Sequence, residues 1–261
     1  MFTEERQSRI EQVILDRGSV SVQELSELFN VSEVTIRKDL DELQKGDTIK
    51  RTHGGAVAKY HALERAAFQS LTNRRKQEKK AIARKALTFV EDGDTILMDG
   101  SSTTSELAHL LESSGIRDLT VIPTSLIIAQ IVNNGKIKVI LLGGDLDPKM
   151  SSVSGPLTEN LLSQFSVDKG FIGVNGIERR FGFSADGFQE AAVKLAIGHA
   201  SRETFVLADH SKFRKKFLAK VCDLKGVFQY LITDRHAGID YSELENMVDV
   251  VFAGEEESAG S

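Results

Sequence analysis

The chain has 261 residues, and its hydrophobic content of 41% is enough for the cores of two domains. The formal net charge is −5, so the sequence lacks the global basic field typical of many nucleic-acid binders. A single cysteine, Cys222, excludes an intramolecular disulfide and a cysteine-based zinc site. The apolar stretches are too short to span a bilayer, and the first residues do not resemble a signal peptide, so we expect a cytoplasmic protein.

Two helices are expected over the first thirty residues. The first covers residues 3–17 and ends at Gly18. Ser21 and Glu24 then form a capping box, with Ser at the N-cap and Glu at the third helical position, which opens a helix ending near Phe29. The apolar residues expected on the inner faces are Ile10, Val13, Ile14, Val22, Leu25, Leu28 and Phe29.

A third helix is expected to begin after the N-cap residue Ser32. Its inner face carries apolar residues at helical spacing, namely Ile36, Leu40 and Leu43. Its outer face suits a DNA major groove, because arginine can bind guanine with two hydrogen bonds and threonine or valine can contact a thymine methyl group. That face carries Val34, Thr35, Arg37 and Lys38. The alternative is a solvated helix of a small bundle, but the short helix just before it favours a helix-turn-helix.

A strand over residues 48–51 runs into the Gly54–Gly55 turn, which predicts the wing of a winged helix-turn-helix domain over residues 1–58. Within this domain eight Lys and Arg face eleven Asp and Glu, so DNA binding must depend on local charge placement. The residues expected to contact DNA are Ser32, Val34, Thr35, Arg37, Lys38, Lys50, Arg51, His53 and Gly54.

Four ordered segments resemble the DNA-binding domain of DeoR-type bacterial transcriptional regulators. They begin with Arg6 and Ile10 and continue through residues 22–32, 35–40 and 50–56. Lys38 stands where that family more often has arginine, which keeps the charge but loses the two-pronged hydrogen bonding.

We expect residues 59–73 to be a linker and residues 253–261 to be a disordered tail. The basic residues between 59 and 85 far outnumber the acidic ones, so this segment either contacts phosphate or exposes a solvated helix face.

A larger α/β domain is expected over residues 74–252, because short apolar runs alternate there with helical patterns. This arrangement predicts a mostly parallel sheet with both faces covered and a ligand site at the carboxyl ends of its strands. Strands are expected at 95–98, 119–122, 138–142, 169–174, 204–207, 230–233 and 248–252, and helices at 74–88, 106–111, 126–132 and 190–201.

Small and hydroxyl-bearing residues follow three of these strands. Residues 99–105 form a loop that leads into a helix, where a phosphate would meet free N–H groups, the helix dipole and hydroxyl donors. Thr124 and Ser125 follow the next strand, and Gly143 and Gly144 follow the third. One such loop could be an ordinary turn with an N-cap residue, but several together predict an anion site.

This part of the chain looks like the sensor domain of the same regulators, which is similar to the ribose-5-phosphate isomerase and coenzyme-A-transferase folds. The resemblance implies a phosphorylated sugar as effector. The resemblance implies that its phosphate is bound by Gly100, Ser101, Ser102, Thr103 and Thr104. It implies that its sugar is lined by Asp99, Lys194, Asp209 and Lys212. Thr124, Ser125, Gly143, Gly144 and Asn175 would complete the site. Thr124 replaces the family's usual Asn, and Asn175 its usual Asp.

We therefore expect a homo-oligomeric, non-enzymatic regulator of a sugar-metabolism operon, most often a repressor in this family, that binds operator DNA and needs no metal or cofactor. The alternative is a sugar-phosphate isomerase-like enzyme with an accessory DNA-binding domain. In that enzyme the acid and base groups would be Glu190, Lys194, Asp209 and Lys212. RNA binding ranks last, because the chain has no Trp and only three Tyr for stacking on bases.

Overall fold

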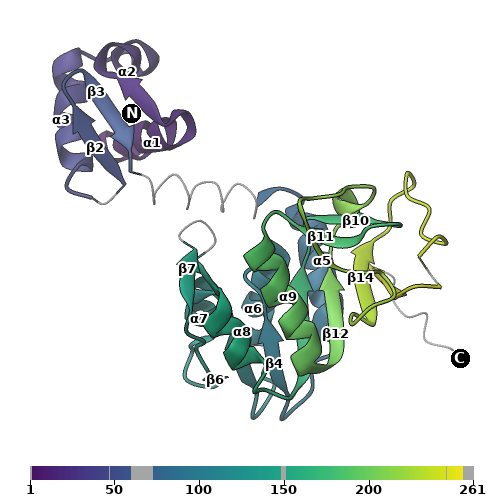
Figure 1. Ribbon diagram of the computed structural model, residues 1–261. Helices are drawn as coiled ribbons and strands as arrows, with labels where there is room; N and C mark the ends of the chain where they lie inside the picture. Colours follow the sequence, from purple (N-terminus) through teal and green to yellow (C-terminus); the bar gives the residue numbers. More distant parts are fainter. Residues whose placement is uncertain (1, 47, 60–72, 148–150, 245, 255–261) are drawn as a thin grey trace, which may run out of the picture. The chain divides into compact units, whose positions relative to one another are not determined.

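The chain forms two compact units, residues 1–71 and 72–261 (Figure 1). The structure, a computed structural model, describes residues 2–46, 48–59, 73–147, 151–244 and 246–254. Most of the expected linker and the greater part of the expected tail lie outside the described residues.

The first unit packs helices against a small antiparallel sheet. Its elements are α1 (Thr3–Arg17), β1 (Ser19–Ser21), α2 (Val22–Phe29), α3 (Glu33–Leu43), β2 (Ile49–Thr52) and β3 (Gly55–Ala58). The three strands lie in the order β1-β3-β2. The hydrophobic core includes Ile10, Leu25, Ile36, Leu40 and Ile49, all completely buried. This is the winged helix-turn-helix architecture expected from the sequence.

Local hydrogen bonds begin α2 and α3 where the sequence predicts. The Ser21 hydroxyl accepts from the backbone N–H of Glu24 at 3.2 Å, and the Glu24 carboxylate accepts from the N–H of Ser21 at 2.8 Å. The Ser32 hydroxyl likewise accepts from the N–H of Thr35 at 3.2 Å. One prediction is wrong, because Leu28 is 52% exposed. Six residues at about 100° each place it roughly 120° around the helix from Val22, off the inner face.

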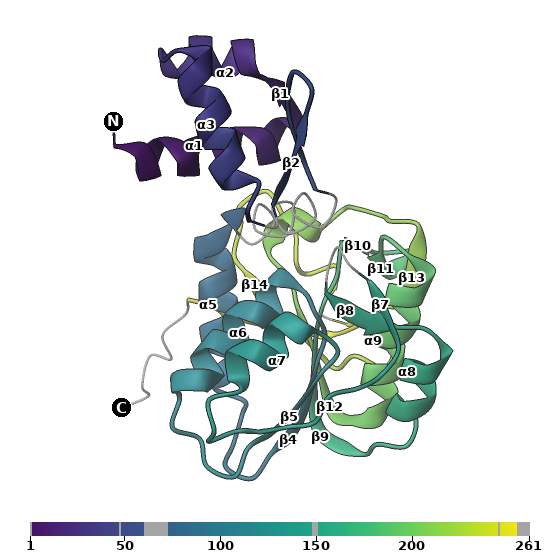
Figure 2. The ribbon, with the colours of Figure 1, turned by 90° about the vertical axis from the view of Figure 1, so that its left-hand side faces the viewer.

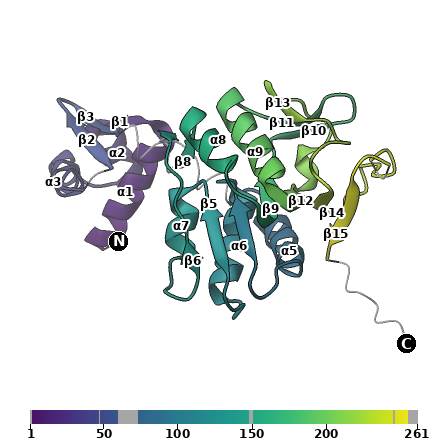
Figure 3. The same ribbon diagram turned by 60° about the horizontal axis from the view of Figure 1, so that its bottom comes forward.

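The second unit is built on a seven-stranded sheet in the order β15-β14-β12-β9-β4-β5-β6 (Figure 3). Every neighbouring pair is parallel, and the strands are the seven that the sequence predicts. Their bounds are β4 (Thr95–Met98), β5 (Thr120–Pro123), β6 (Lys138–Val139), β9 (Val167–Gly173), β12 (Ser201–Leu207), β14 (Tyr230–Asp234) and β15 (Asp249–Ala253). The third is shorter than expected, because β6 ends at Val139 and the chain leaves the sheet with Leu141 exposed.

Helices cover both faces of this sheet (Figure 2). One face holds α5 (Lys76–Leu87), α6 (Ser102–Ser113) and α7 (Leu126–Val132), and the other holds α8 (Pro156–Leu162) and α9 (Phe188–Ala200). Alternate residues of β4 point to opposite faces of the sheet and pack into the hydrophobic cores on the two sides. Ile96 and Met98 pack with the first group of helices, whereas Leu97 packs with the second.

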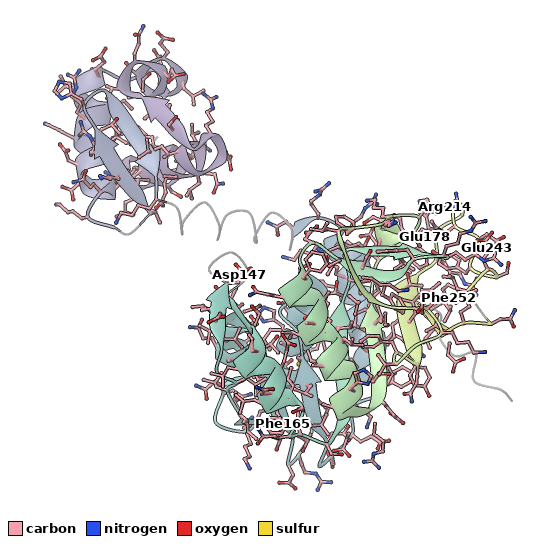
Figure 4. All side chains as sticks on the ribbon, in the orientation of Figure 1. Asp147, Phe165, Glu178, Arg214, Glu243 and Phe252 are labelled. Atoms are coloured by element: carbon pink, nitrogen blue, oxygen red, sulfur yellow. The ribbon has the colours of Figure 1, made fainter. Side chains whose placement is uncertain are left out.

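Two smaller sheets were not predicted. A hairpin pairs β7 (Asp145–Asp147) with β8 (Ser152–Ser154), and an antiparallel sheet joins β10 (Gly176–Glu178), β11 (Gly182–Ala185) and β13 (Ala219–Cys222). Phe252 lies on β15, at the edge of the sheet (Figure 4). Its ring packs against the Tyr241 ring with centroids 5.0 Å apart. None of the helices in the described ranges is both long and apolar enough to cross a membrane.

Candidate functional site

The inner face of helix α3 is packed against the rest of the first unit, and its outer face is exposed to solvent. Its inner-face Asp39 is 2% exposed and accepts from the Arg6 guanidinium of α1 at 2.7 Å and from the Gln7 amide at 3.0 Å. On its outer face Val34 is 60% exposed, and Arg37 and Lys38 are exposed as well. The fold therefore fixes the helix through buried contacts and leaves Val34, Arg37 and Lys38 open to solvent, whereas Thr35 is half-buried.

Among the described residues, the Arg37 side chain has only a surface partner. Its guanidinium donates to the Glu33 carboxylate, one turn earlier, at 2.7 Å, and both side chains are about half exposed. Such a pair contributes roughly 0.3–0.5 kcal/mol. Arg37 can exchange it for a partner of another molecule at little cost.

The basic residues of the wing, which the sequence analysis listed together as DNA contacts, have different environments in the structure. Lys50, His53 and Gly54 are exposed on β2 and on the β2–β3 turn. Arg51 instead lies against α3, where it donates to the Asp41 carboxylate at 2.5 Å and to the carbonyl oxygen of Arg37 at 3.1 Å. Arg51 thus links strand β2 of the wing to α3, a role that the sequence pattern does not reveal.

In the second unit, Asp99 lies at the centre of the candidate effector site, at the carboxyl end of β4, and is 2% exposed. One of its oxygens accepts from the N–H of Ser101 at 3.1 Å and from the Thr104 hydroxyl at 3.0 Å. The other accepts from the N–H of Gly173 at 2.9 Å and pairs with the Lys194 ammonium. Asp99 therefore joins the loop before α6, strand β9 and helix α9.

Lys194 is buried and pairs with two carboxylates, those of Asp99 and of Glu190, the latter at 3.0 Å. Burial opposes its charge, but the attraction of Asp99 and Glu190 outweighs this and raises the pKa of Lys194 above the ordinary value for lysine. The ammonium therefore stays protonated at neutral pH.

The helix α6 follows a hydroxyl-rich segment, but it starts at Ser102, four residues earlier than expected, so residues 102–105 of the expected loop lie in its first turn. The Ser101 hydroxyl caps it by accepting from the N–H of Thr104 at 3.2 Å. Gly100 lies so close to the neighbouring strands that an added Cβ atom would be 2.0 Å from the Ser152 hydroxyl and 3.1 Å from the Cβ atom of Ser125. Ser102 is half-buried and Thr103 buried in the first turn of α6. The loops after β4 and β5 and the strand β8 therefore converge at this helix terminus.

Ser125 has an unusual environment, because its hydroxyl is buried and has no hydrogen-bond partner among the described residues. Buried polar groups almost always have a partner, so this hydroxyl, beside a capped helix terminus, is suited to bind a ligand. The adjacent Thr124 is buried and held by backbone hydrogen bonds to Met98 and Val153.

Other predicted residues have structural contacts. An added Cβ atom at Gly144 would lie 1.9 Å from the Thr158 hydroxyl, which itself donates to the carbonyl oxygen of Gly143 at 2.9 Å. These two glycines let α8 approach, and their described contacts do not reach the α6 loop. Asp209 is 1% exposed and accepts from the N–H of Ser211 at 2.9 Å.

A buried lysine that the sequence did not single out lies on α5. Lys79 is 4% exposed, and burial lowers its pKa. The charges that act on it most strongly include Asp209, Lys212 and Glu106. Sequence reasoning missed Lys79 and Glu106, because only helix packing brings α5 and α6 to the strand ends. The described ranges contain no group of three or more His, Cys, Asp or Glu side chains able to hold a metal ion.

Comparison with known proteins agrees with this two-part organisation. Residues 6–61 match the DeoR-like helix-turn-helix domain, and residues 74–235 match the DeoR C terminal sensor domain. The chain is 35% identical to the uncharacterized HTH-type transcriptional regulator YulB of Bacillus subtilis, covering 95% of each chain. It is 32% identical to the glycerol-3-phosphate regulon repressor of Escherichia coli, covering 83% of this chain and 85% of that one. The structure of ribose 5 phosphate isomerase A from Neisseria gonorrhoeae aligns with a TM-score of 0.39 at 20% identity, over 53% of each chain.

Proposed function

Because the chain belongs to the DeoR family of helix-turn-helix transcriptional regulators, we propose that it represses a sugar-metabolism operon and that a phosphorylated sugar changes its affinity for operator DNA. The proposal that a phosphorylated sugar binds rests on the Ser125 hydroxyl. It is buried without a hydrogen-bond partner among the described residues, beside the capped amino terminus of α6. A phosphate there would accept from Ser125 and from the free N–H groups of the helix.

For the DNA part, we assign base reading to the exposed face of α3 and backbone contacts to the wing. Thr35 and Arg37 suit base edges, whereas Lys38, Lys50 and His53 suit phosphates. Arg51, bound to Asp41, positions the wing. A bacterial operator lies in the cytoplasm, where we expect the protein to act.

We further propose that the protein binds DNA as a homo-oligomer, at least a dimer. Residues 1–58 contain more acidic than basic residues, so one copy has only modest electrostatic attraction to DNA. Two copies on paired half-sites multiply modest affinities.

A regulator accounts for the site better than an isomerase does. A catalytic base near neutral pH needs a free, suitably tuned group. Asp99 already accepts four hydrogen bonds, and Lys194 is held in its protonated form by two carboxylates. Lys194, one of the acid and base groups that an isomerase would use, is therefore not free to take a proton.

The decisive experiment combines a thermal-shift panel of sugar phosphates with Ser125→Ala. A ligand at 100 times its dissociation constant stabilises the protein by about 2.7 kcal/mol, so binding is easily seen. Because the Ser125 hydroxyl has no hydrogen-bond partner in the described part of the chain, its removal should leave the unliganded protein at least as stable, yet should weaken effector binding by about 0.5–1.5 kcal/mol.

Ser113→Ala, at the other end of α6, is the matched control and should change neither quantity. Stabilisation by free sugars as strong as by their phosphates, or an unaltered effector affinity in Ser125→Ala, would show that the phosphate does not bind here. A bound effector that leaves operator affinity unchanged would rule out the proposed switch.

A further inference from the structure

The candidate effector site has a second end, beside α9, where carboxylates outnumber cations. Asp99 and Glu190 both pair with the Lys194 ammonium, so its charge is fully engaged within the protein. A third carboxylate, Asp186, lies in electrostatic range of Glu190, Lys194 and Lys212. Among the groups that act on Asp186 and Lys194, the carboxylates Asp99, Glu190 and Asp186 outnumber the ammonium groups Lys194 and Lys212, which makes this end net negative.

Asp186 is placed by a contact specific to this fold. It follows β11 and directly precedes Gly187, the N-cap residue of α9. Its carboxylate accepts from the Asn175 side-chain amide at 2.9 Å and has no other hydrogen-bond partner among the described residues. Asn175 comes two residues after Gly173, whose N–H donates to Asp99 at 2.9 Å. The Asn175–Asp186 pair therefore lies next to the Asp99–Lys194 pair.

The electrostatic surroundings of Asp186 agree with a position inside the site. Partial burial and the charge of Glu190 raise the pKa of Asp186, whereas Lys212 and Lys194 lower it. The side chain is nonetheless exposed, so a ligand can reach it.

We propose that the Asn175–Asp186 pair determines effector specificity by selecting a monophosphate whose far end is uncharged and rich in hydroxyl groups. Hydroxyls donate to the free oxygen of Asp186, while the Asn175 amide holds the carboxylate in place. A second phosphate or a carboxylate at this end would meet net negative charge, and the buried cation there, Lys194, is already paired with two carboxylates. The inference rests on the proposed function, since it describes the same site, whose other end is marked by the orphaned Ser125 hydroxyl.

The test is isothermal titration of the full chain with three matched pairs of ligands. The pairs are fructose 6-phosphate with fructose 1,6-bisphosphate, glucose 6-phosphate with 6-phosphogluconate, and glycerol 3-phosphate with 3-phosphoglycerate. In any pair that binds, the member with the uncharged end should bind at least about 10-fold more tightly, as expected for a site that leaves a wrong group unpaired.

Two variants separate the charge of the pair from its geometry. Asp186→Asn should weaken binding of the uncharged-end member by about 10-fold, the effect of losing a hydrogen bond to a charged acceptor, and should reduce discrimination against its anionic counterpart. Asn175→Ala should weaken binding but preserve the discrimination, because the negative charge remains. Asp223→Asn, which removes an exposed carboxylate beside the same small sheet, should change neither.

Equal or tighter binding of the anionic members, or an unchanged ratio in Asp186→Asn, would overturn this inference and leave the proposed function standing. A role of the pair in merely starting α9 would lower thermal stability without moving the ratio, and that result also contradicts the inference. Failure of all six compounds to bind would overturn the proposed effector class itself.

Discussion

Arg37 is the residue on which sequence-specific DNA reading should depend most. Arg37→Ala should weaken cognate operator binding by roughly 1–3 kcal/mol, because a two-pronged contact to guanine is lost. Fluorescence anisotropy with the operator and single-base variants measures this. Lys45→Ala is the control, since Lys45 follows the last turn of α3 and pairs with Glu42 on the surface. Unchanged operator affinity in Arg37→Ala would show that another face reads the DNA.

The Asp99–Lys194 pair shows how a single contact can hold a site together. Lys194→Met should destabilise the protein by about 3–5 kcal/mol, because it leaves a buried carboxylate unpaired. Adding Asp99→Asn should recover part of that loss. Denaturant titrations of the wild type and both variants give these differences, and a fully stable single variant would contradict the role assigned to the pair.

The same pair sets an expectation for pH. The pKa of Lys194 is raised in the folded state, so its stabilisation is complete below the ordinary lysine pKa of about 10.4 and is lost only as pH rises through the higher folded value. The stability difference between the wild type and the double variant Lys194→Met, Asp99→Asn, in which no carboxylate at position 99 can titrate, should therefore stay constant from about pH 6 to 9. A marked change within that window would mean that Lys194 is not held protonated.

At the scale of elements, the wing is held to its own unit by close backbone contact. A Cβ atom at Gly55 would lie 2.1 Å from the carbonyl oxygen of Val20, whereas one at Gly54 would have no atom within 4 Å. Gly55→Ala should thus cost about 1–3 kcal/mol through overpacking and separate β3 from β1, while Gly54→Ala should be close to neutral. Thermal unfolding followed by circular dichroism compares the two, and equal effects would contradict the pairing of β1 with β3.

Two helices illustrate how one local signal serves two purposes. Ser32 and Ser101 each cap a helix by accepting from the N–H three residues later, at 3.2 Å in both cases. The first cap begins α3, whose outer face is open to solvent. The second begins α6, whose amino terminus lies near Ser125, the N-cap residue of α7, and Ser152 of strand β8. The cap sets where a helix starts, and its surroundings decide what that terminus can bind.

At the scale of the whole molecule, the proposed regulator should bind DNA through two copies. Light scattering with operator DNA should show at least a dimer. Half-sites should lie about 34–36 Å apart, or a multiple of it. Inserting about five base pairs between them should lower affinity sharply, because it rotates one half-site to the opposite side of the DNA. Monomers bound with unchanged affinity to an isolated half-site would contradict the proposal.

Much of the architecture was predictable from the sequence. The capping box at Ser21, the helix stop at Gly18 and the seven strands of the parallel sheet depend on interactions within a few residues or on the spacing of apolar side chains. Each of these signals depends on residues close together in the sequence, so it can be recognised without knowing the fold.

Within the candidate site, the sequence identified the hydroxyl loop before α6 and the presence of Asp99 and Lys194. It did not reveal that Ser125 is left without a partner, that Arg51 is bound to Asp41, or that Asp186 meets Asn175. These facts depend on which strand ends and loops become neighbours.

The sequence by itself therefore determined the two-domain plan, most helix positions and the strands of the large parallel sheet, but it missed α8 and placed the start of α6 four residues late. Only the tertiary structure decided which charges are paired and which groups remain open. Asp99 and Lys194 are 95 positions apart, and Arg6 and Asp39 are 33 apart, so no local pattern records either pair. Burial is set by the packing of elements that are distant in the sequence. It decides whether a charged or polar side chain pairs within the protein or remains available to bind another molecule.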